Sequence, residues 1–282
     1  MNLFHAQLCS LFKSKKIIKI ISGLNNTNIN QIIRITKSAE LSGASYIDII
    51  ANPKIVSIIK SITFLPICVS SIDPLQLYNC VLAGADLVEI GNFDSLYEKN
   101  LNFSSIQVIQ LAQYTRLLIR NRDIAVTIPN KLSLHDQINL AKDLERLNIN
   151  IIQTEGFFSK NNIISPINMI NDQIIYSTTK SSEALASTYI ISKYINLPVI
   201  AASGIDYISS SVAIFYGASG IGISSSVKYK KTIYDMTYYI DQILYSIYIQ
   251  NNSNSNISYT ILRKQIYDFI LIYGLNNIYC NM

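Results

Sequence analysis

Eight short runs rich in β-branched residues alternate with amphipathic segments along most of the chain, and this alternation restricts the fold more than any other feature. Strands that alternate with helices pair in parallel through right-handed crossovers, and continuous apolar runs indicate burial on both faces of a sheet. Eight such units in about 250 residues predict a (β/α)8 TIM barrel. A doubly wound open sheet is the alternative, although its usual glycine-rich motif after the first strand is missing. The predicted strands are Ile17–Ser22, Tyr46–Ala51, Ile67–Ser71, Leu87–Gly91, Ile124–Ile128, Ile151–Glu155, Val199–Ser203 and Gly220–Ser224.

An internal repeat favours the barrel. Residues 65–73 and 83–91 form one copy, and residues 197–206 and 216–224 form a second copy that differs by one inserted residue, Gly204. Units that recur in phase along the chain are expected of a closed barrel built from paired βα modules. An open sheet gives no reason for such a repeat.

Turn and cap residues mark several helix boundaries. Asn52 and Asp73 each precede a proline, which predicts a capping side chain followed by proline at the first helical position. The amphipathic segments between the strands include Ile138–Leu147 and Ser182–Ile195. Three glycines are expected to end helices in the left-handed conformation. They are Gly43, Gly84 and Gly217.

The same alternation gives the domain organisation. Residues 1–250 are expected to form a single barrel domain, residues 251–258 a polar linker, and residues 259–282 a helical tail. The apolar side of the tail is expected to pack on the outside of the barrel or on a partner, for example a second copy in a homo-oligomer. The connection from Phe157 to Lys180 is long and rich in Asn and Ser, so it is interpreted either as a lid over the barrel mouth or as a surface insertion.

Composition excludes several kinds of function. Only 15% of the 282 residues are charged, the net charge is +5, and no window holds the 18 or more uncharged apolar residues of a membrane-spanning helix. The sequence has no basic cluster interleaved with aromatic residues, so nucleic-acid binding is not expected. The four cysteines lie far apart and only two histidines are present, so no metal centre, disulfide framework or other cofactor is expected. His135 follows a predicted helix cap at Ser133 and is interpreted as a partly exposed side chain rather than as a catalytic group.

Polar residues at the C-terminal ends of the strands are the main site candidates, because the active sites of (β/α)8 barrels lie there. The repeat places Asp48, Glu89, Gln153 and Gly222 at one depth in the second, fourth, sixth and eighth strands, as an inward ring of three polar groups and a gap. Glu155 lies two residues nearer the mouth. Asp48, Glu89 and Glu155 are the candidates for acid–base catalysis, since burial among isoleucines raises the pKa of a carboxyl group.

Lys19, on the first strand, has two interpretations. Its ammonium can pair with Asp48 or Glu89 as a structural ion pair inside the barrel. Alternatively, Lys19 is a catalytic amine that forms a Schiff base with a carbonyl substrate. The sequence leaves both open.

The seventh and eighth strands point to a phosphate site. Compared with the sister copy of the repeat, a glycine is inserted after Ser203, and the counterpart of Glu89 is Gly222. An acid is thereby removed and backbone is exposed, and Ser224 and Ser225 are expected to open a short helix whose N-terminus favours an anion. Loops after strands seven and eight frequently bind phosphate in this architecture, although the glycines can also serve only to relieve crowding inside the barrel. The predicted phosphate-binding residues are Ser203, Gly204, Gly222, Ser224 and Ser225.

Six stretches of the chain carry a family resemblance. They are Lys19–Asn26, Asp48–Pro53, Leu65–Ser71, Val88–Asp94, Ile152–Gly156 and Ala202–Gly204. Together they resemble the hypothetical chloroplast reading frame 23 family of algal plastids and cyanobacteria, an aldolase-type barrel family of unassigned activity. The resemblance covers Leu11 to Val227 and implies a plastid protein, placed here in the chloroplast stroma. One departure is the run Ser224–Ser226, where the family and other phosphate-binding barrels usually show Gly-Ser-Ala.

The expected function is that of an enzyme or former enzyme that binds a small phosphorylated metabolite and transfers protons in an isomerase, lyase or synthase reaction. Asn25, Asn92 and Gln153, at or near strand ends, are expected to bind the substrate. The alternative is a non-catalytic barrel that senses a metabolite or binds a partner protein. The fold hosts many chemistries, so the sequence does not choose a reaction.

Overall fold

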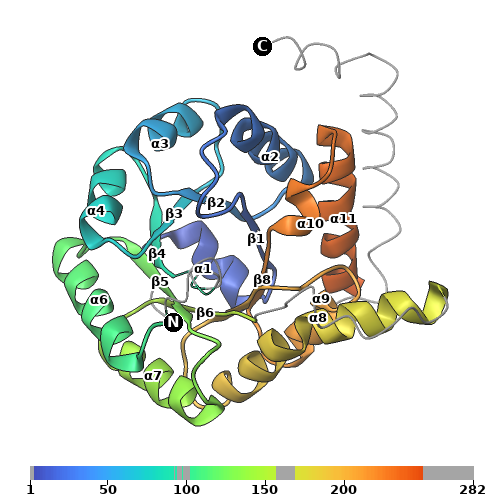
Figure 1. The fold of residues 1–282 in the computed structure, drawn as a ribbon. Coiled ribbons are helices and arrows are strands. Elements are labelled where there is room, and N and C mark those ends of the chain that lie inside the picture. Colours follow the sequence, from blue (N-terminus) through green and yellow to red (C-terminus); the bar gives the residue numbers. More distant parts are fainter. Residues whose placement is uncertain (1–2, 92, 94–96, 98–101, 157–168, 250–282) are drawn as a thin grey trace.

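The computed structural model is a closed barrel of eight parallel strands with helices around it (Figure 1), and it describes residues 3–91, 93, 97, 102–156 and 169–249. The strands follow chain order around the barrel, and β1 pairs with β8, so the (β/α)8 prediction is confirmed and the open sheet is wrong. Each predicted strand matches an observed one to within two residues at either end. The strands are β1 Ile17–Ile21, β2 Tyr46–Ile50, β3 Ile67–Ser71, β4 Leu87–Ile90, β5 Asp123–Ile128, β6 Ile151–Thr154, β7 Val199–Ala201 and β8 Gly220–Ile223.

Helices cover the outer face of the barrel, and their apolar sides meet the outward side chains of the strands in one continuous core. The described helices are α1 Ala6–Lys13, which lies at one end of the barrel, and α2 Ile29–Ser42, α3 Pro53–Lys60, α4 Pro74–Leu82, α6 Ser105–Leu118, α7 Leu134–Arg146, α8 Met169–Ile191, α9 Ser210–Phe215, α10 Ser225–Lys228 and α11 Ile233–Ile249. Among the described residues no helix is both long and apolar enough to span a bilayer.

The predicted helix boundaries are largely confirmed. The Asn52 side chain accepts a hydrogen bond from the Lys54 amide at 3.0 Å, and the Asp73 side chain accepts one from the Leu75 amide at 2.9 Å. In both helices proline follows the cap. The three helix-ending glycines have left-handed backbone, with φ of 74° at Gly43, 109° at Gly84 and 105° at Gly217.

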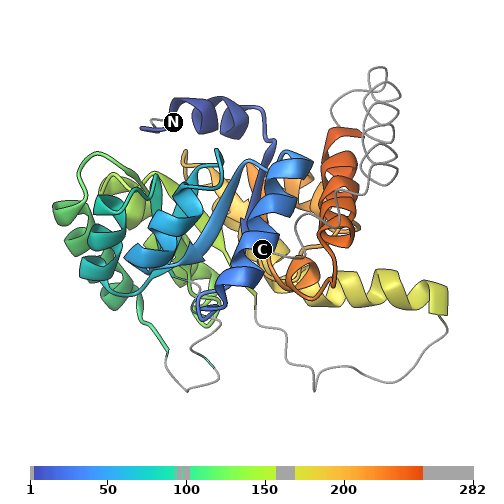
Figure 2. The same ribbon diagram turned by 90° about the horizontal axis from the view of Figure 1, so that it is seen from above.

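Helix α1 closes the N-terminal end of the barrel (Figure 2). Its Leu8 and Phe12 are fully buried against the lowest inward side chains of the strands, which include Ile17, Tyr46 and Leu87. The C-terminal ends of all eight strands meet at the opposite end, the mouth of the barrel.

The prediction for the connection after β6 is wrong in its second half. Residues 169–180 belong to α8, which begins at Met169 rather than near Ser182. The polar composition misled the prediction, because serines on this helix satisfy their hydroxyls locally: Ser181 donates to the Ser177 carbonyl at 2.7 Å, and Ser177 donates to Asp206 at 2.7 Å. Residues 157–168, the predicted linker 251–258 and the predicted tail 259–282 lie outside the described residues.

Candidate active site inside the barrel

The inward ring predicted from the repeat converges on one lysine. The Lys19 ammonium lies 2.8 Å from Asp48 Oδ2, donates a hydrogen bond of 2.9 Å to Gln153 Oε1, and also forms an ion pair with Glu89. All four side chains are at most 1% exposed. One ammonium, two carboxyl groups and one amide therefore meet inside the barrel, from strands β1, β2, β4 and β6.

Two hydroxyl groups complete the hydrogen bonding of the carboxyl groups. Ser70 Oγ lies 2.7 Å and 2.8 Å from the two oxygens of Asp48, and Thr127 Oγ1 donates to Glu89 Oε1 at 2.8 Å. Gln153 Nε2 also donates to Glu89 Oε1, at 2.7 Å. The polar groups of this buried layer thus satisfy one another's hydrogen bonds, which a buried ionic cluster needs in order to be stable.

The charges of the layer do not cancel. One ammonium faces two carboxyl groups, so the cluster is negative when both are ionised. Burial alone would lower the pKa of Lys19, but attraction to Asp48 and Glu89 holds that pKa well above its ordinary value. Burial raises the pKa of Glu89, with Lys19 opposing and Asp48 adding to the rise. The layer therefore contains a permanent cation and a carboxyl group that retains a proton more readily than usual.

This protonation pattern bears on the two interpretations of Lys19. A Schiff base forms from a neutral amine, whereas the raised pKa and both carboxyl partners keep Lys19 as an ammonium. The geometry favours the ion pair, and it joins Lys19 to both acids rather than to one of them.

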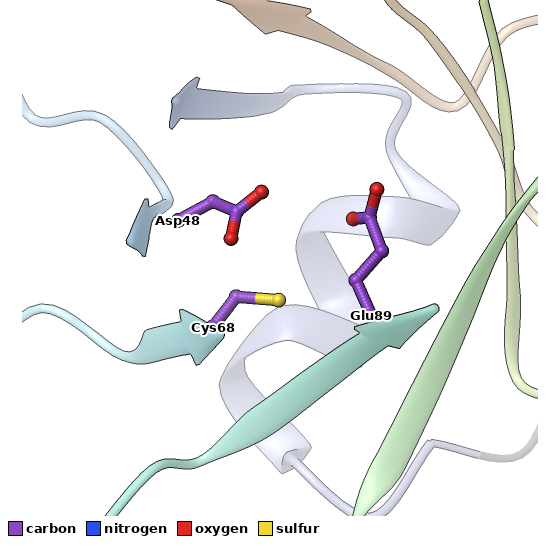
Figure 3. A group of neighbouring side chains, drawn as sticks. All are labelled: Asp48, Cys68 and Glu89. Atoms are coloured by element: carbon purple, nitrogen blue, oxygen red, sulfur yellow. The ribbon is translucent and has the colours of Figure 1, made fainter. Parts of the chain in front are cut away.

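Asp48, Cys68 and Glu89 form the one group of metal-ligand side chains found in the described part of the chain (Figure 3), with their ligand atoms within 4.8 Å of one another. The Lys19 ammonium contacts both carboxyl groups of this group. Burial also raises the pKa of the Cys68 thiol well above its ordinary value. A divalent ion would have to displace the ammonium and deprotonate the thiol, so the donor set fits a metal poorly.

Glu155 forms a second polar group nearer the mouth. It accepts hydrogen bonds from the Tyr97 hydroxyl and from the Asn130 amide, the latter at 3.2 Å, and it is 2% exposed. Burial and the nearby Glu155 carboxylate raise the pKa of Tyr97, so the phenol stays a donor. Gln153 and Glu155 lie two residues apart on one strand and its end, which places a carboxyl group one level above the Lys19 layer.

The predicted phosphate-binding residues line the ends of β7 and β8. Ser203 has a φ of 67°, a left-handed conformation that serine rarely adopts, and Gly204 follows with a φ of 75°. Ser224 precedes α10 without capping it by its side chain, and Ser225 is exposed. Local strain of this kind is common where backbone approaches a ligand, but by itself it identifies none.

Two of the glycines have a packing role. A Cβ on Gly220 would lie 2.4 Å from Ile17 Cβ, so this position is explained by crowding inside the barrel, as the alternative interpretation held. A Cβ on Gly204 would lie 2.1 Å from the Lys180 carbonyl oxygen. A bulky residue at Gly204 would therefore disturb the packing of α8 and would not be a clean probe of ligand binding. A Cβ on Gly222 would be less crowded, because it would lie 3.0 Å from Ala202 Cβ and 3.5 Å from Gln153 Oε1.

One expected substrate-binding residue, Asn25, does not join the buried layer. Asn25 is exposed, whereas its neighbour Asn26 is buried, and Asn92 lies outside the described residues. His135 is exposed on α7, as expected of a surface residue. Ser70 and Thr127 are not among the predicted site residues, although both lie two residues beyond another inward position of their strand, so strand alternation could have found them.

Solved structures with this fold include several synthases of phosphorylated compounds. The chain is similar to (S)-3-O-geranylgeranylglyceryl phosphate synthase from Thermoplasma acidophilum, solved with sn-glycerol-1-phosphate, with a TM-score of 0.59, 12% identity, and 88% of this chain and 98% of that chain covered. It is also similar to 3-hexulose-6-phosphate synthase from Salmonella typhimurium, with a TM-score of 0.57, 10% identity, and coverage of 82% and 98%. At these identities the likeness shows the aldolase-type barrel fold alone.

Sequence relatives are much more similar. Proteins called "Uncharacterized protein ycf23" are 52% identical over 248 residues in Antithamnion sp. and 42% identical over 235 residues in Cyanophora paradoxa. The first match covers 87% of this chain and 90% of the relative, and the second covers 83% and 93%. The family described as "Protein of unknown function (DUF561)" matches residues 4–253, which include every strand and helix described above. The chain therefore belongs to the DUF561 family, together with the ycf23 proteins of these algae.

Proposed function

We propose that the protein is a TIM-barrel enzyme, or a barrel descended from one, that binds a small phosphorylated metabolite at the open end and transfers protons in an isomerase, lyase or synthase reaction. The observation that carries this proposal is the ring of Lys19, Asp48, Glu89 and Gln153, each the third residue of its strand and buried in the middle of the barrel. Burying three charged groups costs several kcal/mol per ion, so a purely structural core would use apolar residues at these positions.

The ring has the parts that proton transfer needs. Burial raises the pKa of Glu89, so its carboxyl group holds a proton more readily than an ordinary glutamate, while Lys19 stays positive beside it. A negative charge that develops on a substrate oxygen is stabilised by such a fixed ammonium in a water-poor interior. Glu155 lies one level nearer the mouth and supplies a second carboxyl group. Asp48 orients the ammonium and keeps it charged.

The backbone at the ends of β7 and β8, a fold neighbour and the usual phosphate site of such barrels support the phosphate part of the proposal. The backbone at Ser203 and Gly204 is left-handed at the end of β7, and β8 continues into a short helix at Ser225 without a capping side chain. The fold neighbours include a synthase solved with sn-glycerol-1-phosphate. Loops seven and eight hold phosphate in many barrels of this architecture. We place the phosphate group of the ligand there, with Ser203, Gly204, Gly222, Ser224 and Ser225 around it.

A second candidate function is metabolite sensing without turnover. It is favoured by the tight pairing of the Lys19 layer, in which each charged group already has partners and at most 1% exposure. A sensor would use the same barrel mouth to bind a ligand and would leave the layer as a structural element. The two candidates differ in whether Glu89 is needed for chemistry or only for stability.

Ligand binding is the first test. A ligand at about 100 times its dissociation constant stabilises a protein by about 2.7 kcal/mol, which shifts the melting temperature by several degrees. We expect such a shift with sn-glycerol-1-phosphate or with members of a panel of sugar phosphates, and no shift with their unphosphorylated forms. A panel without any phosphate-dependent shift would contradict the proposal.

Substitutions then separate binding from chemistry. Ser225→Glu places a carboxylate at the exposed start of α10, where the helix tolerates it but a phosphate is repelled. We expect it to abolish the shift, whereas the matched change Ser57→Glu, on the exposed side of α3, keeps it. Glu89→Gln is expected to bind the ligand and to lose turnover. Retained turnover in Glu89→Gln would reject its catalytic role, and binding without turnover in every variant and the wild type would favour sensing.

Relatives named ycf23 in several algae agree with a plastid protein, and we propose the stroma as its compartment. The partner we expect is the small phosphorylated molecule. A homo-oligomer that uses residues 259–282 is a further expectation, which size-exclusion chromatography with light scattering of the full chain and of a chain ending at residue 258 tests directly.

A further inference from the structure

The turn after β1 is held rigidly at the barrel mouth. The Asn26 amide donates to the Gly23 carbonyl at 3.2 Å, and the buried Asn26 side chain donates to the Ser22 carbonyl at 3.2 Å. Asn26 Oδ1 also accepts a hydrogen bond from the Asn28 amide at 3.1 Å. These bonds fix residues 22–26 in one conformation, so the surface that they present is preformed.

A lysine from the neighbouring strand end lies over this turn. Strands β1 and β8 are paired, and Lys228 is the last residue of α10, the short helix that follows β8. Its Nζ lies 3.5 Å from the point that a Cβ on Gly23 would occupy. Gly23 has no side chain and a φ of 105°, so the lysine reaches directly over the backbone of the turn.

The Lys228 ammonium lacks a protein partner within the described part of the chain. It makes none of the ion pairs, side-chain hydrogen bonds or ring contacts found there, in contrast to Lys19, Lys37 and Lys60, which all pair with carboxyl groups. Lys228 is nevertheless only half-exposed. A partly buried cation without a counter-charge is available to an anion from outside the chain.

Ser22, adjacent to Gly23, supplies an independent observation. It is 0% exposed, and its hydroxyl has no hydrogen-bond partner among the described residues. Buried hydroxyl groups almost always have a partner, so an unpaired one calls for a partner from outside the chain, such as a water molecule or an ion. An unpaired hydroxyl group and an unpaired cation thus occur at one turn: Ser22 directly precedes Gly23, and Lys228 lies over Gly23.

We propose that Ser22, Gly23 and Lys228 form the anion-binding part of the ligand site, where the Lys228 ammonium neutralises the phosphate group of the metabolite. This inference rests on the proposed function and deepens it: the phosphate lies towards the β8–β1 side of the mouth, and its counter-charge is a side chain rather than backbone alone. A phosphate monoester has three acceptor oxygens and nearly two negative charges at neutral pH, which suits an ammonium together with a hydroxyl donor.

The test measures inorganic phosphate binding to the full chain by phosphorus NMR titration at constant ionic strength. Losing a charge-assisted hydrogen bond weakens binding by about 10- to 100-fold, so Lys228→Met is expected to raise the phosphate dissociation constant by that factor. Ser22→Ala is expected to raise it by a smaller factor, and Lys228→Arg to retain most of the affinity. The control Lys54→Met removes an exposed lysine of α3 and is expected to change nothing.

The outcomes separate this inference from the function on which it rests. If wild-type protein shows no phosphate binding, both the phosphate site and this inference are rejected. If wild type binds phosphate and Ser225→Glu abolishes the binding while Lys228→Met binds as wild type does, the proposed function stands and the inference is overturned. A loss of binding in Lys228→Met and Ser22→Ala that leaves Lys54→Met unchanged, with melting temperatures near that of wild type, supports it.

Discussion

Lys19 Nζ lies 2.8 Å from Asp48 Oδ2 in the centre of the barrel, where neither side chain is more than 1% exposed. Removing one member of a buried ion pair leaves the other charged groups without compensation and typically costs about 3–5 kcal/mol. Lys19→Met should therefore lower the free energy of unfolding by about that amount near neutral pH, as measured by urea denaturation. The loss should shrink in acid, because the stranded Glu89 carboxyl group, whose pKa burial raises, then takes up a proton.

The control for this prediction is a surface ion pair of the same chemistry. Lys60 Nζ lies 2.7 Å from Asp86 Oδ2, but the two side chains are 42% and 25% exposed. Pairs of this kind contribute about 0–1 kcal/mol, so Lys60→Met should change stability little. Equal effects of Lys19→Met and Lys60→Met would show that the interior pair is not sealed from water.

Asp241, on α11, should give the protein a pH-dependent stability. Burial raises its pKa to about 7, compared with 3.8 for an ordinary aspartate. Because the folded state holds this proton more tightly than the unfolded state, its contribution is fully present below pH 3.8 and is lost as the pH rises towards 7. Asp241→Asn removes the cost of ionising the buried carboxyl group, so the variant should unfold at higher urea concentration than wild type at pH 8.

The pH series decides the cause of that gain. At pH 4 the wild-type carboxyl group is already protonated in the folded state, so the advantage of Asp241→Asn should be small there. Asp143, which is 42% exposed and pairs with Arg146, serves as the control, and Asp143→Asn should show no comparable trend. A gain in Asp241→Asn that is constant from pH 4 to pH 8 would contradict a titration at this site.

The barrel was predictable because its signals are local and repeated. Each strand is an apolar run bounded by cap or turn residues, and the repeat fixed the relative depth of Asp48 and Glu89 without any knowledge of contacts. The helical start of α8 was not predictable in the same way. Its serines read as loop residues, but in the folded chain Ser177 and Ser181 bond to Asp206 and to the preceding helical turn.

The details of the site depend on contacts that no local pattern contains. Lys19 is separated from Gln153 by 134 residues, and only barrel closure brings them to 2.9 Å. Thr127 is an ordinary strand residue in the sequence, and its role appears only when Glu89 of the neighbouring strand lies beside it. That Asn26 is buried while Asn25 is exposed depends on the backbone of a turn that begins with φ of 105° at Gly23.

Gly220→Ala should destabilise the barrel through steric crowding. The added Cβ would lie 2.4 Å from Ile17 Cβ, at the seam where β8 and β1 close the barrel. Overpacking in a closed core costs about 1–3 kcal/mol and more where backbone must move. Gly84→Ala is the control: its φ of 109° strains an alanine by about 1 kcal/mol, but its nearest new neighbour is Lys60 Cγ at 3.6 Å. A smaller loss in Gly220→Ala than in Gly84→Ala, by thermal unfolding, would contradict the tight seam.

Helix α1 should be held on the barrel by one buried carboxyl group as well as by packing. Asp123, at the start of β5, accepts hydrogen bonds of 2.9 Å from the amides of Phe4 and His5, just before α1. Burial raises the pKa of Asp123, and these two bonds oppose the rise. Asp123→Ala should therefore loosen α1, whereas Asp123→Asn keeps one acceptor oxygen and should loosen it less.

Phe12→Ala gives the packing contribution to the same contact. Phe12 is 1% exposed against the lowest layer of the barrel, and removing a buried phenylalanine side chain costs about 3–5 kcal/mol. Because α1 is terminal, the loss should appear as local opening, which trypsin reports by faster cleavage after Lys13 and Lys16. Cys9→Ala, at a partly exposed position of the same helix, should not accelerate the cleavage. Equal cleavage rates in wild type, Phe12→Ala and Cys9→Ala would show that α1 does not open independently of the rest of the fold.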